Sequence, residues 1–581
     1  MKQPRVVALL TAAGVAVATV AVGVSLSPAG AAPAKHRYLV VARSAADLDG
    51  VAREARSAGA TVLPVGGTTV VAVQATAAQA ASLDASALTT TVVPDRRVSL
   101  VDQQFVGTSL PTSLSRTRFD GTAHGSKVAF DPASSLSGLM WNLDRIRAPR
   151  ANNRTLGSSS VTVAVADTGL DYTHSELANR IVGQADFATG TPDEVCKNYF
   201  GGDDTDLAAE FGGPADTDWN GHGSWIGGNI GAALDGVGIN GIAPKVDLFD
   251  LKIADWCGST WDSSILGAFD YAAAHHFDVV SISFGGYLDR SDPEQEAIYQ
   301  AYVTSVSNAR KAGTLIVAAA GNEHTRVGKG GQVLSHGTLT LPGDDVADYY
   351  GLWETPGGIP GVLMVSATGN VVAAPSATCA TGTFEDGNAV CKRATDAHQA
   401  KGIGRQDQLT YYSNYGPRID IAAPGGSRKF NLPNIDGGGT AGFPFTTADG
   451  TTAFEEFSIT SNWALEIPCV TFDASSPFYP DECYSSIQGT SMATPHVSAV
   501  AGLVASAKPW LRHHPDAIAA WLKATARDAH NTTQPLSATD TSPADRTGVA
   551  CPTGYCHLGG RAVSDREAYG AGIVDAAAAV R

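Results

Sequence analysis

The stretch Val161-Thr162-Val163-Ala164-Val165-Ala166 is a short apolar run, and Asp167-Thr168-Gly169 follows it directly. The same kind of run recurs downstream and alternates with helical patterns, at residues 263–275 (helical), 279–283 (apolar), 295–312 (helical) and 315–320 (apolar). Continuous apolar strands that alternate with helices are typical of a parallel sheet buried on both faces. The sequence therefore predicts an α/β domain built on a doubly wound, mostly parallel sheet.

Composition and charge indicate a globular chain that does not bind nucleic acid. Of its 581 residues, 44% are hydrophobic and only 17% are charged, so a large core can form. The 57 acidic residues exceed the 40 basic residues and give a net charge of −17. This sign argues against phosphate-rich partners, and we expect neither nucleic acid nor an anionic membrane surface as a partner.

The first 34 residues have the pattern of an export signal. Lys2 and Arg5 precede an uncharged stretch from Val6 to Ala34 that ends in small residues. Because Val6 to Leu26 is long enough to span a bilayer, a retained membrane anchor is the alternative. The small residues at the end of the stretch are the flank that signal peptidases need, which favours a secreted mature protein without stable membrane association.

Cysteine usage agrees with an oxidising compartment. The chain has eight cysteines, namely Cys196, Cys257, Cys379, Cys391, Cys469, Cys483, Cys551 and Cys556. Short sequence separations favour the pairs Cys379–Cys391, Cys469–Cys483 and Cys551–Cys556, which leaves Cys196 for Cys257. A zinc site is the weaker alternative, because none of these pairs has the C-x-x-C spacing and no histidine stands at ligand spacing.

Residues 35–102 form a separate pattern at the start of the chain. Strands and helices alternate there in the order βαββαβ, at residues 36–42, 46–58, 61–65, 68–73, 77–83 and 90–93. This order predicts a small α+β domain of the ferredoxin-like kind. Residues 103–138 are rich in Ser, Thr and Gly without periodicity, which is typical of an exposed connector where proteases cut.

Three short segments carry reactive side chains where an α/β sheet holds its active site, at strand ends or helix starts. They are Asp167-Thr168-Gly169, Asn220-Gly221-His222-Gly223-Ser224 and Gly489-Thr490-Ser491-Met492-Ala493-Thr494-Pro495-His496. Each has a plainer interpretation when taken alone: an aspartate in a turn, a buried structural histidine and a serine that caps a helix. The glycines beside His222 are expected to leave its ring approachable, and Pro495 fits an early helical turn after Ser491.

Together, the three segments supply the groups that activate a serine nucleophile. A serine hydroxyl needs a base to take its proton, and a carboxylate fixes the tautomer of that base. Asn322 follows the apolar run 315–320 and adds an amide that can donate to the oxyanion of a tetrahedral intermediate. The α/β-hydrolases use the chain order Ser, acid, His and the motif G-x-S-x-G, which Ala493 breaks here.

In the order of these motifs the chain resembles the secreted subtilases, the subtilisin-like serine proteases. The matching stretches are residues 165–171, 220–223, 281–286, 318–323, 411–425, 489–502 and 569–575. The resemblance covers nearly all of residues 139–581, which it implies to be a subtilisin-like catalytic domain. It implies Ser491 as nucleophile, His222 as general base and then acid, Asp167 as the group that orients His222, and Asn322 as oxyanion donor.

The resemblance also implies how polypeptide substrates and the N-terminal domain bind. An extended substrate would pair as an added strand beside Ser283, Phe284, Gly285 and Gly258, with Phe284 lining an apolar subsite. Residues 35–102 would act as an inhibitory, fold-assisting propeptide that is removed by self-cleavage in the connector 103–138. An independent binding domain is the alternative for this segment. We expect the mature protein to be a monomer.

The chain departs from compact members of that family in several places. Ser224-Trp225 follows His222 where many relatives carry Thr-His, and three stretches are longer, at about 324–361, 375–408 and 428–485. Such loops shape binding or are tolerated decoration, so substrate preference stays open. The chemistry requires no cofactor, but relatives often bind structural calcium, and the oxygen-rich loops here are either its ligands or solvated acidic turns: Asp203, Asp204, Thr205, Asp206, Asp216 and Asp218.

The sequence thus predicts a secreted, self-maturing serine endopeptidase. One alternative is a catalytically silent binding scaffold of the same fold, which is disfavoured because all four catalytic positions keep competent residue types. The other alternative is an acyl-transfer enzyme that joins peptides.

Overall fold

The computed structural model describes residues 33–99, 136, 140–188, 203–335, 349–369, 407, 409–410, 412–426, 459–465, 483–529 and 563–581. Almost all of the predicted signal peptide and connector lies outside these residues, so both stay predictions. Two cysteines, Cys257 and Cys483, fall within the described part, and both are disulfide-bonded. The other six lie outside it, and the predicted pairings are therefore untested. No helix in the described part is long and apolar enough to cross a membrane.

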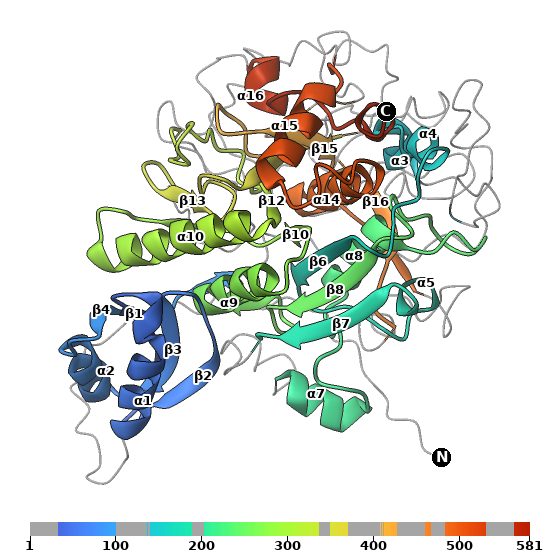
Figure 1. Ribbon diagram of the computed structural model, residues 1–581. Helices are drawn as coiled ribbons and strands as arrows, with labels where there is room; N and C mark the ends of the chain where they lie inside the picture. The colour runs from blue at the N-terminus through green and yellow to red at the C-terminus, as the bar shows by residue number, and fades with distance from the viewer. Residues whose placement is uncertain are drawn as a thin grey trace, which may run out of the picture.

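A parallel sheet of seven strands forms the centre of the molecule (Figure 1). In the order in which they lie side by side, the strands are β15 (Ile421–Pro424), β14 (Leu363–Thr368), β12 (Leu315–Ala319), β10 (Val279–Ile282), β6 (Thr162–Asp167), β8 (Asp247–Lys252) and β7 (Ile181–Asp186). Every neighbouring pair is parallel. The three apolar runs found in the sequence are thus neighbours, and the predicted mostly parallel sheet is confirmed.

Helices cover both faces of this sheet. The pleat points alternate residues to opposite sides, so Val163 and Val165 join one buried cluster while Ala164 and Ala166 join another. The first cluster includes residues of α8 (His222–Gly231) and α14 (Thr490–Ala507). The second includes residues of α9 (Asp262–Ala274) and α10 (Pro293–Ala312). A sheet buried on both faces is the reason why its strands read as continuous apolar runs.

Smaller elements surround the sheet. Among the described residues after position 140, the other helices are α3 (Trp141–Arg145), α4 (Ala148–Asn152), α5 (Ser175–Ala178), α7 (Asp204–Phe211), α15 (Pro515–Thr525), α16 (Asp565–Tyr569) and α17 (Ala576–Ala579). Two antiparallel strand pairs involve the predicted insertions: β11 (Gly286–Leu288) with β13 (Trp353–Thr355), and β16 (Ile459–Asn462) with β17 (Tyr484–Ile487). Of the insertion at 375–408, the structure describes residue 407 alone.

The N-terminal segment folds around its own four-stranded antiparallel sheet, in the order β2-β3-β1-β4. Its elements follow one another as predicted: β1 (His36–Ala42), the short 3₁₀ helix η1 (Ala45–Asp47), α1 (Leu48–Ser57), β2 (Thr61–Gly66), β3 (Val70–Ala75), α2 (Ala77–Asp84) and β4 (Thr89–Pro94). A separate core cluster that includes Val40, Val51 and Leu83 holds it together. The segment lies beside α9 and α10 (Figure 1). β5 (Arg97–Ser99) extends from it and pairs with β9 (Ser259–Trp261).

Candidate active site

The residues singled out in the sequence lie at strand ends and helix starts of the main sheet. Asp167 is the last residue of β6, and Asn322 follows β12. His222 is the first residue of α8, and Ser491 is the second residue of α14. Because the carboxyl ends of parallel strands meet at one edge of a sheet, this topology gathers side chains from distant parts of the chain.

Asp167 and His222 are in direct contact. His222 Nδ1 lies 2.5 Å from Asp167 Oδ1, and both side chains are almost fully buried. The carboxylate oxygen also accepts a hydrogen bond from the backbone N–H of Thr168 at 2.8 Å. A carboxylate at this position holds the proton on Nδ1 and leaves Nε2 as the basic nitrogen of the ring. In the described part of the chain, Nε2 is buried and has no hydrogen-bond partner.

Ser491 is held by the end of β10. Its hydroxyl donates to the carbonyl oxygen of Ser283 at 3.3 Å, and the hydroxyl of Ser283 donates to the carbonyl oxygen of Ser491 at 3.1 Å. Only 1% of Ser491 is exposed. Within the described residues its hydroxyl has no hydrogen bond to His222, a contact that often forms only when substrate is bound. The structure therefore holds the serine in a closed site.

Asn322 is oriented by the residue before Ser491. Its Oδ1 accepts hydrogen bonds from Thr490, at 2.9 Å from the backbone nitrogen and 2.8 Å from Oγ1. These two bonds identify the oxygen end of the amide. The nitrogen end, Nδ2, lies 3.5 Å from the position that a Cβ on Gly489 would occupy. The amide thus presents its donor beside the backbone that leads into Ser491.

The glycines around His222 have a different role from the expected one. A Cβ on Gly223 would collide with the carbonyl oxygen of Gly169, and a Cβ on Gly221 would collide with the ring of Trp463. Gly223 therefore allows α8 to pack closely against the turn that follows Asp167, and Gly221 leaves room for the ring of Trp463. His222 itself is fully buried, so the expectation of an approachable ring is wrong for this structure.

Asp218 links the segment at residues 167–169 to the segment at residues 220–224 by hydrogen bonds. Its carboxylate accepts hydrogen bonds from the Thr168 hydroxyl at 2.9 Å and from the backbone nitrogens of Asn220, Gly221 and Ser224 at 3.0, 2.8 and 2.8 Å. This role of Asp218 was not predicted from the sequence. The Asp-x-Asn-Gly spacing, which is typical of an Asx turn, was the available signal.

The candidate calcium ligands do not form a shared site. Asp203 caps α7, and its backbone N–H donates to Asp206. Asp204 forms an ion pair with Lys252, and Asp216 accepts from the Tyr172 hydroxyl. Among the described residues, no group of three or more His, Cys, Asp or Glu side chains could hold a metal ion. Donors of the protein itself contact these carboxylates, and the expected structural calcium stays a prediction.

The four predicted substrate-binding residues differ in their exposure and in their contacts. Ser283 contacts Ser491, and Gly285 is partly exposed at the end of β10. Phe284 was expected to line an apolar subsite. Its side chain is instead fully buried in the cluster that also contains Val98 and Leu288, so it does not line an open subsite in this structure. Gly258 directly precedes β9.

β9 already has an added strand, which comes from the N-terminal segment. β5 pairs with it antiparallel, with Arg97 opposite Trp261, Val98 opposite Thr260 and Ser99 opposite Ser259. The guanidinium groups of Arg37 and Arg97 lie over the ring of Trp261, 4.5 and 4.8 Å from its centre. This edge of β9 is thus filled by a strand of this chain's own N-terminal segment.

Two carboxylates, the buried Asp95 and the half-buried Asp270, join the N-terminal segment to α9. Asp95 accepts hydrogen bonds from Arg37 Nε at 3.1 Å and from the hydroxyl and backbone nitrogen of Ser263 at 2.6 and 3.1 Å. Burial raises the pKa of Asp95 to about 6, although Arg37 opposes this rise. On α9, Asp270 accepts from the backbone of Thr68 and from Ser305, and burial raises its pKa to about 6 as well.

The contacts of Trp225 account for the pair Ser224-Trp225, which stands after His222 in place of Thr-His. Its side chain is fully buried, and its indole nitrogen donates to the carbonyl oxygen of Ser485 at 3.1 Å. Ser485 belongs to β17, whose partner strand β16 lies in the third predicted insertion. The unusual residue on α8 therefore packs against a hairpin that the longer loop supplies.

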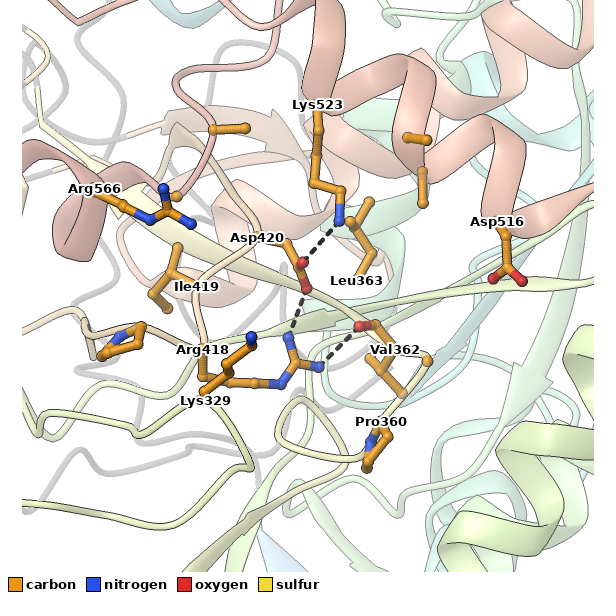
Figure 2. Close-up of a pocket in the computed structure, with 16 residues that line it drawn as sticks. Lys329, Pro360, Val362, Leu363, Arg418, Ile419, Asp420, Asp516, Lys523 and Arg566 are labelled. Atoms are coloured by element: carbon orange, nitrogen blue, oxygen red, sulfur yellow. Dashed lines mark hydrogen bonds and ion pairs between the residues drawn. The ribbon is translucent and has the colours of Figure 1, made fainter.

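A cavity of about 680 Å³ lies elsewhere, at the amino ends of β14 and β15 (Figure 2). Arg418 and Lys523 both form ion pairs with Asp420 there, at 2.6 and 3.1 Å. None of the four candidate catalytic residues lines it. Because those residues lie at carboxyl ends of strands or at helix starts, this cavity is separate from the candidate active site.

Known proteins are similar to this chain over most of its length. The model of the subtilase family matches residues 158–548, which is more than half of the chain. M-protease from Shouchella clausii (strain KSM-K16) is 26% identical over 427 residues, covering 73% of each chain. Subtilisin Savinase from Lederbergia lenta is 26% identical over 369 residues, covering 64% of this chain and 85% of that protein.

Solved structures show the same fold. The epidermin leader peptide processing serine protease of Staphylococcus aureus superposes with a TM-score of 0.57 at 17% identity, covering 94% of this chain and 98% of that one. Fervidolysin from Fervidobacterium pennivorans, described as a keratinolytic enzyme related to subtilisin, superposes with a TM-score of 0.54 at 18% identity, covering 94% and 61%.

Proposed function

The chain belongs to the subtilase family and is a serine-type endopeptidase, and from this premise we propose that it is secreted and cleaves polypeptides through Asp167, His222 and Ser491. The observation that carries the assignment of these residues is the buried contact of 2.5 Å between Asp167 and His222. It prepares Nε2 of the ring to accept a proton, and Ser491 stands at the start of the helix that packs against α8.

In the proposed reaction, His222 Nε2 takes the proton of the Ser491 hydroxyl as the serine oxygen attacks the carbonyl carbon of the substrate. The negative charge that develops on the carbonyl oxygen is stabilised by the Asn322 amide and by the backbone N–H of Ser491. The start of α14 favours the same charge. His222 then gives its proton to the leaving amine, and water repeats the sequence to release the acyl group.

The N-terminal segment is proposed to be an inhibitory propeptide that the enzyme removes from itself. Support comes from the pairing of β5 with β9, which occupies an edge that substrate would need. Further support comes from the buried state of Ser491 and His222 in the full chain. Export through residues 1–34, cleavage within 103–138 and a monomeric mature form belong to the same proposal.

A fluorophosphonate probe tests the proposed nucleophile, because it labels only a serine that a base activates. We expect labelling of the wild-type protein and none of Ser491→Ala. The Ser491→Ala protein should also accumulate as an uncut precursor in a host without other extracellular proteases. A processed wild-type protein that stays unlabelled would instead support the silent scaffold, and peptide-bond formation with an added amine would support acyl transfer.

A further inference from the structure

Two side chains of β8 hold the turn that follows Asp167. Asp250 and Lys252 are alternate residues of one strand, so they point to the same face of the sheet. Lys252 Nζ donates to the carbonyl oxygen of Thr168 at 2.6 Å. Asp250 Oδ2 accepts from the backbone nitrogen of Leu170 at 2.9 Å. One strand therefore fixes both ends of the turn at residues 168–170.

Lys252 is an unusual residue for this position, because it is only 1% exposed. A buried ammonium is costly unless a counter-charge and hydrogen bonds compensate it. Asp204, the first residue of α7, supplies the counter-charge at 2.8 Å. Burial by itself would lower the pKa of Lys252, but the charge and hydrogen bond of Asp204 outweigh it, so the pKa is raised and the group stays charged.

The backbone next to Lys252 contacts the candidate triad directly. The nitrogens of Ile253 and Ala254 donate to the carbonyl oxygen of Asp167 at 2.8 and 3.2 Å. Asp167 is thus held from β8 by its own carbonyl and by the turn that follows it. Because its carboxylate lies 2.5 Å from His222 Nδ1, a small displacement of this turn changes the orientation of the imidazole.

We propose that Lys252 is a positioning residue for the Asp167–His222 pair, with Asp250 fixing the far end of the turn and Asp204 serving as the counter-ion of Lys252. This inference rests on the proposed function, because it concerns the orientation of the proposed general base. The sheet order, with β8 between β6 and β7, places these groups directly beside the strand that carries Asp167 (Figure 1).

The test compares Lys252→Met with the double variant Lys252→Met/Asp204→Asn, both measured per active site by fluorophosphonate titration. The single variant leaves a buried carboxylate without its partner, whereas the double variant removes both charges. We expect the double variant to recover thermal stability but to keep a kcat about 10- to 100-fold below wild type, at nearly unchanged KM. The acid limb of its kcat/KM pH profile should shift to lower pH, because a displaced Asp167 stabilises the imidazolium less.

Lys523→Met is the control for loss of a lysine–aspartate ion pair, because Lys523 pairs with Asp420 at 3.1 Å in the cavity of Figure 2, where the pair is more exposed than that of Lys252 and none of the candidate catalytic residues lies. It should leave kcat and the pH profile as in wild type. If the double variant regains both stability and kcat, or if its pH profile coincides with wild type, Lys252 has a structural role alone and the inference is wrong. A wild-type protein that the probe does not label would instead overturn the proposed function.

Discussion

The contact between Gly223 and Gly169 leads to a sharp prediction about Gly223→Ala. Gly223 lies within α8, where alanine is intrinsically favoured over glycine by about 1 kcal/mol. The added Cβ, however, would come about 1 Å closer to the carbonyl oxygen of Gly169 than the 3.0 Å that real Cβ atoms keep. That oxygen is backbone and cannot move aside alone.

The turn after Asp167 and the start of α8 must therefore separate by about 1 Å, a displacement that can lower turnover about 100-fold. We expect a loss of this size in kcat on a polypeptide substrate and in the rate of fluorophosphonate labelling. The overpacking should also cost about 1–3 kcal/mol of stability, measured by chemical unfolding.

Gly231→Ala is the matched control on the same helix. Its Cβ would lie 3.2 Å from a methyl carbon of Leu248, the flexible end of a side chain. This variant should keep kcat within about 3-fold of wild type, since the side chain can yield. A Gly223→Ala enzyme with the same near-normal kcat would refute the reasoning, because it would mean that the turn and the helix tolerate separation.

Three further predictions follow from the site and its surroundings. Asn322→Ala should lower kcat about 100- to 1000-fold with little change in KM, a magnitude taken from a subtilisin and not from this structure; an equal rise in KM would contradict the assigned role. For Asp270, the raised pKa of about 6 means that its contribution to stability is full below the ordinary value of 3.8 and is lost as the pH rises to about 6. The measurement compares the melting temperature of the Ser491→Ala precursor with that of the same precursor carrying Asp270→Asn as well. The difference between the two melting temperatures should fall from pH 4 to 6 and then stay level. A difference that does not change with pH would show that Asp270 does not titrate in this range. Trp225→Ala should destabilise the protein by about 3–5 kcal/mol in chemical unfolding, and a loss below about 1 kcal/mol would mean that the hairpin packs without it.

Local patterns in the sequence were sufficient for the three middle strands of the central sheet, β6, β10 and β12. The runs at 161–166, 279–283 and 315–320 became neighbouring strands because burial on both faces imposes the same apolar composition on each. The positions of Asp167 and Asn322 at strand ends followed from the same pattern. The roles of these residues in catalysis stay a prediction, which rests on the convergence of strand ends in such sheets.

Contacts between distant segments were not predictable in this way. The ring that lies against Gly221 belongs to Trp463, more than 200 residues away, and nothing in the local sequence indicates it. Phe284 continues an apolar run, but whether such a side chain lines a subsite or enters the core depends on what packs against it. From the local sequence, a lysine at the end of a strand, such as Lys252, would be expected to be exposed. It is buried because α7 places Asp204 beside it as a counter-ion.

The pairing of β5 with β9 has a consequence for the time course of activity. Backbone groups make that ladder, so neighbouring strands of almost any side-chain composition fit the same edge. One strand at a time can occupy it, and the resident one is covalently attached to the molecule, which keeps its local concentration high. If substrate binds at this edge as proposed, added polypeptide competes poorly at first, and hydrolysis should begin after a lag whose length is set by departure of the resident strand and not by the concentration of added polypeptide.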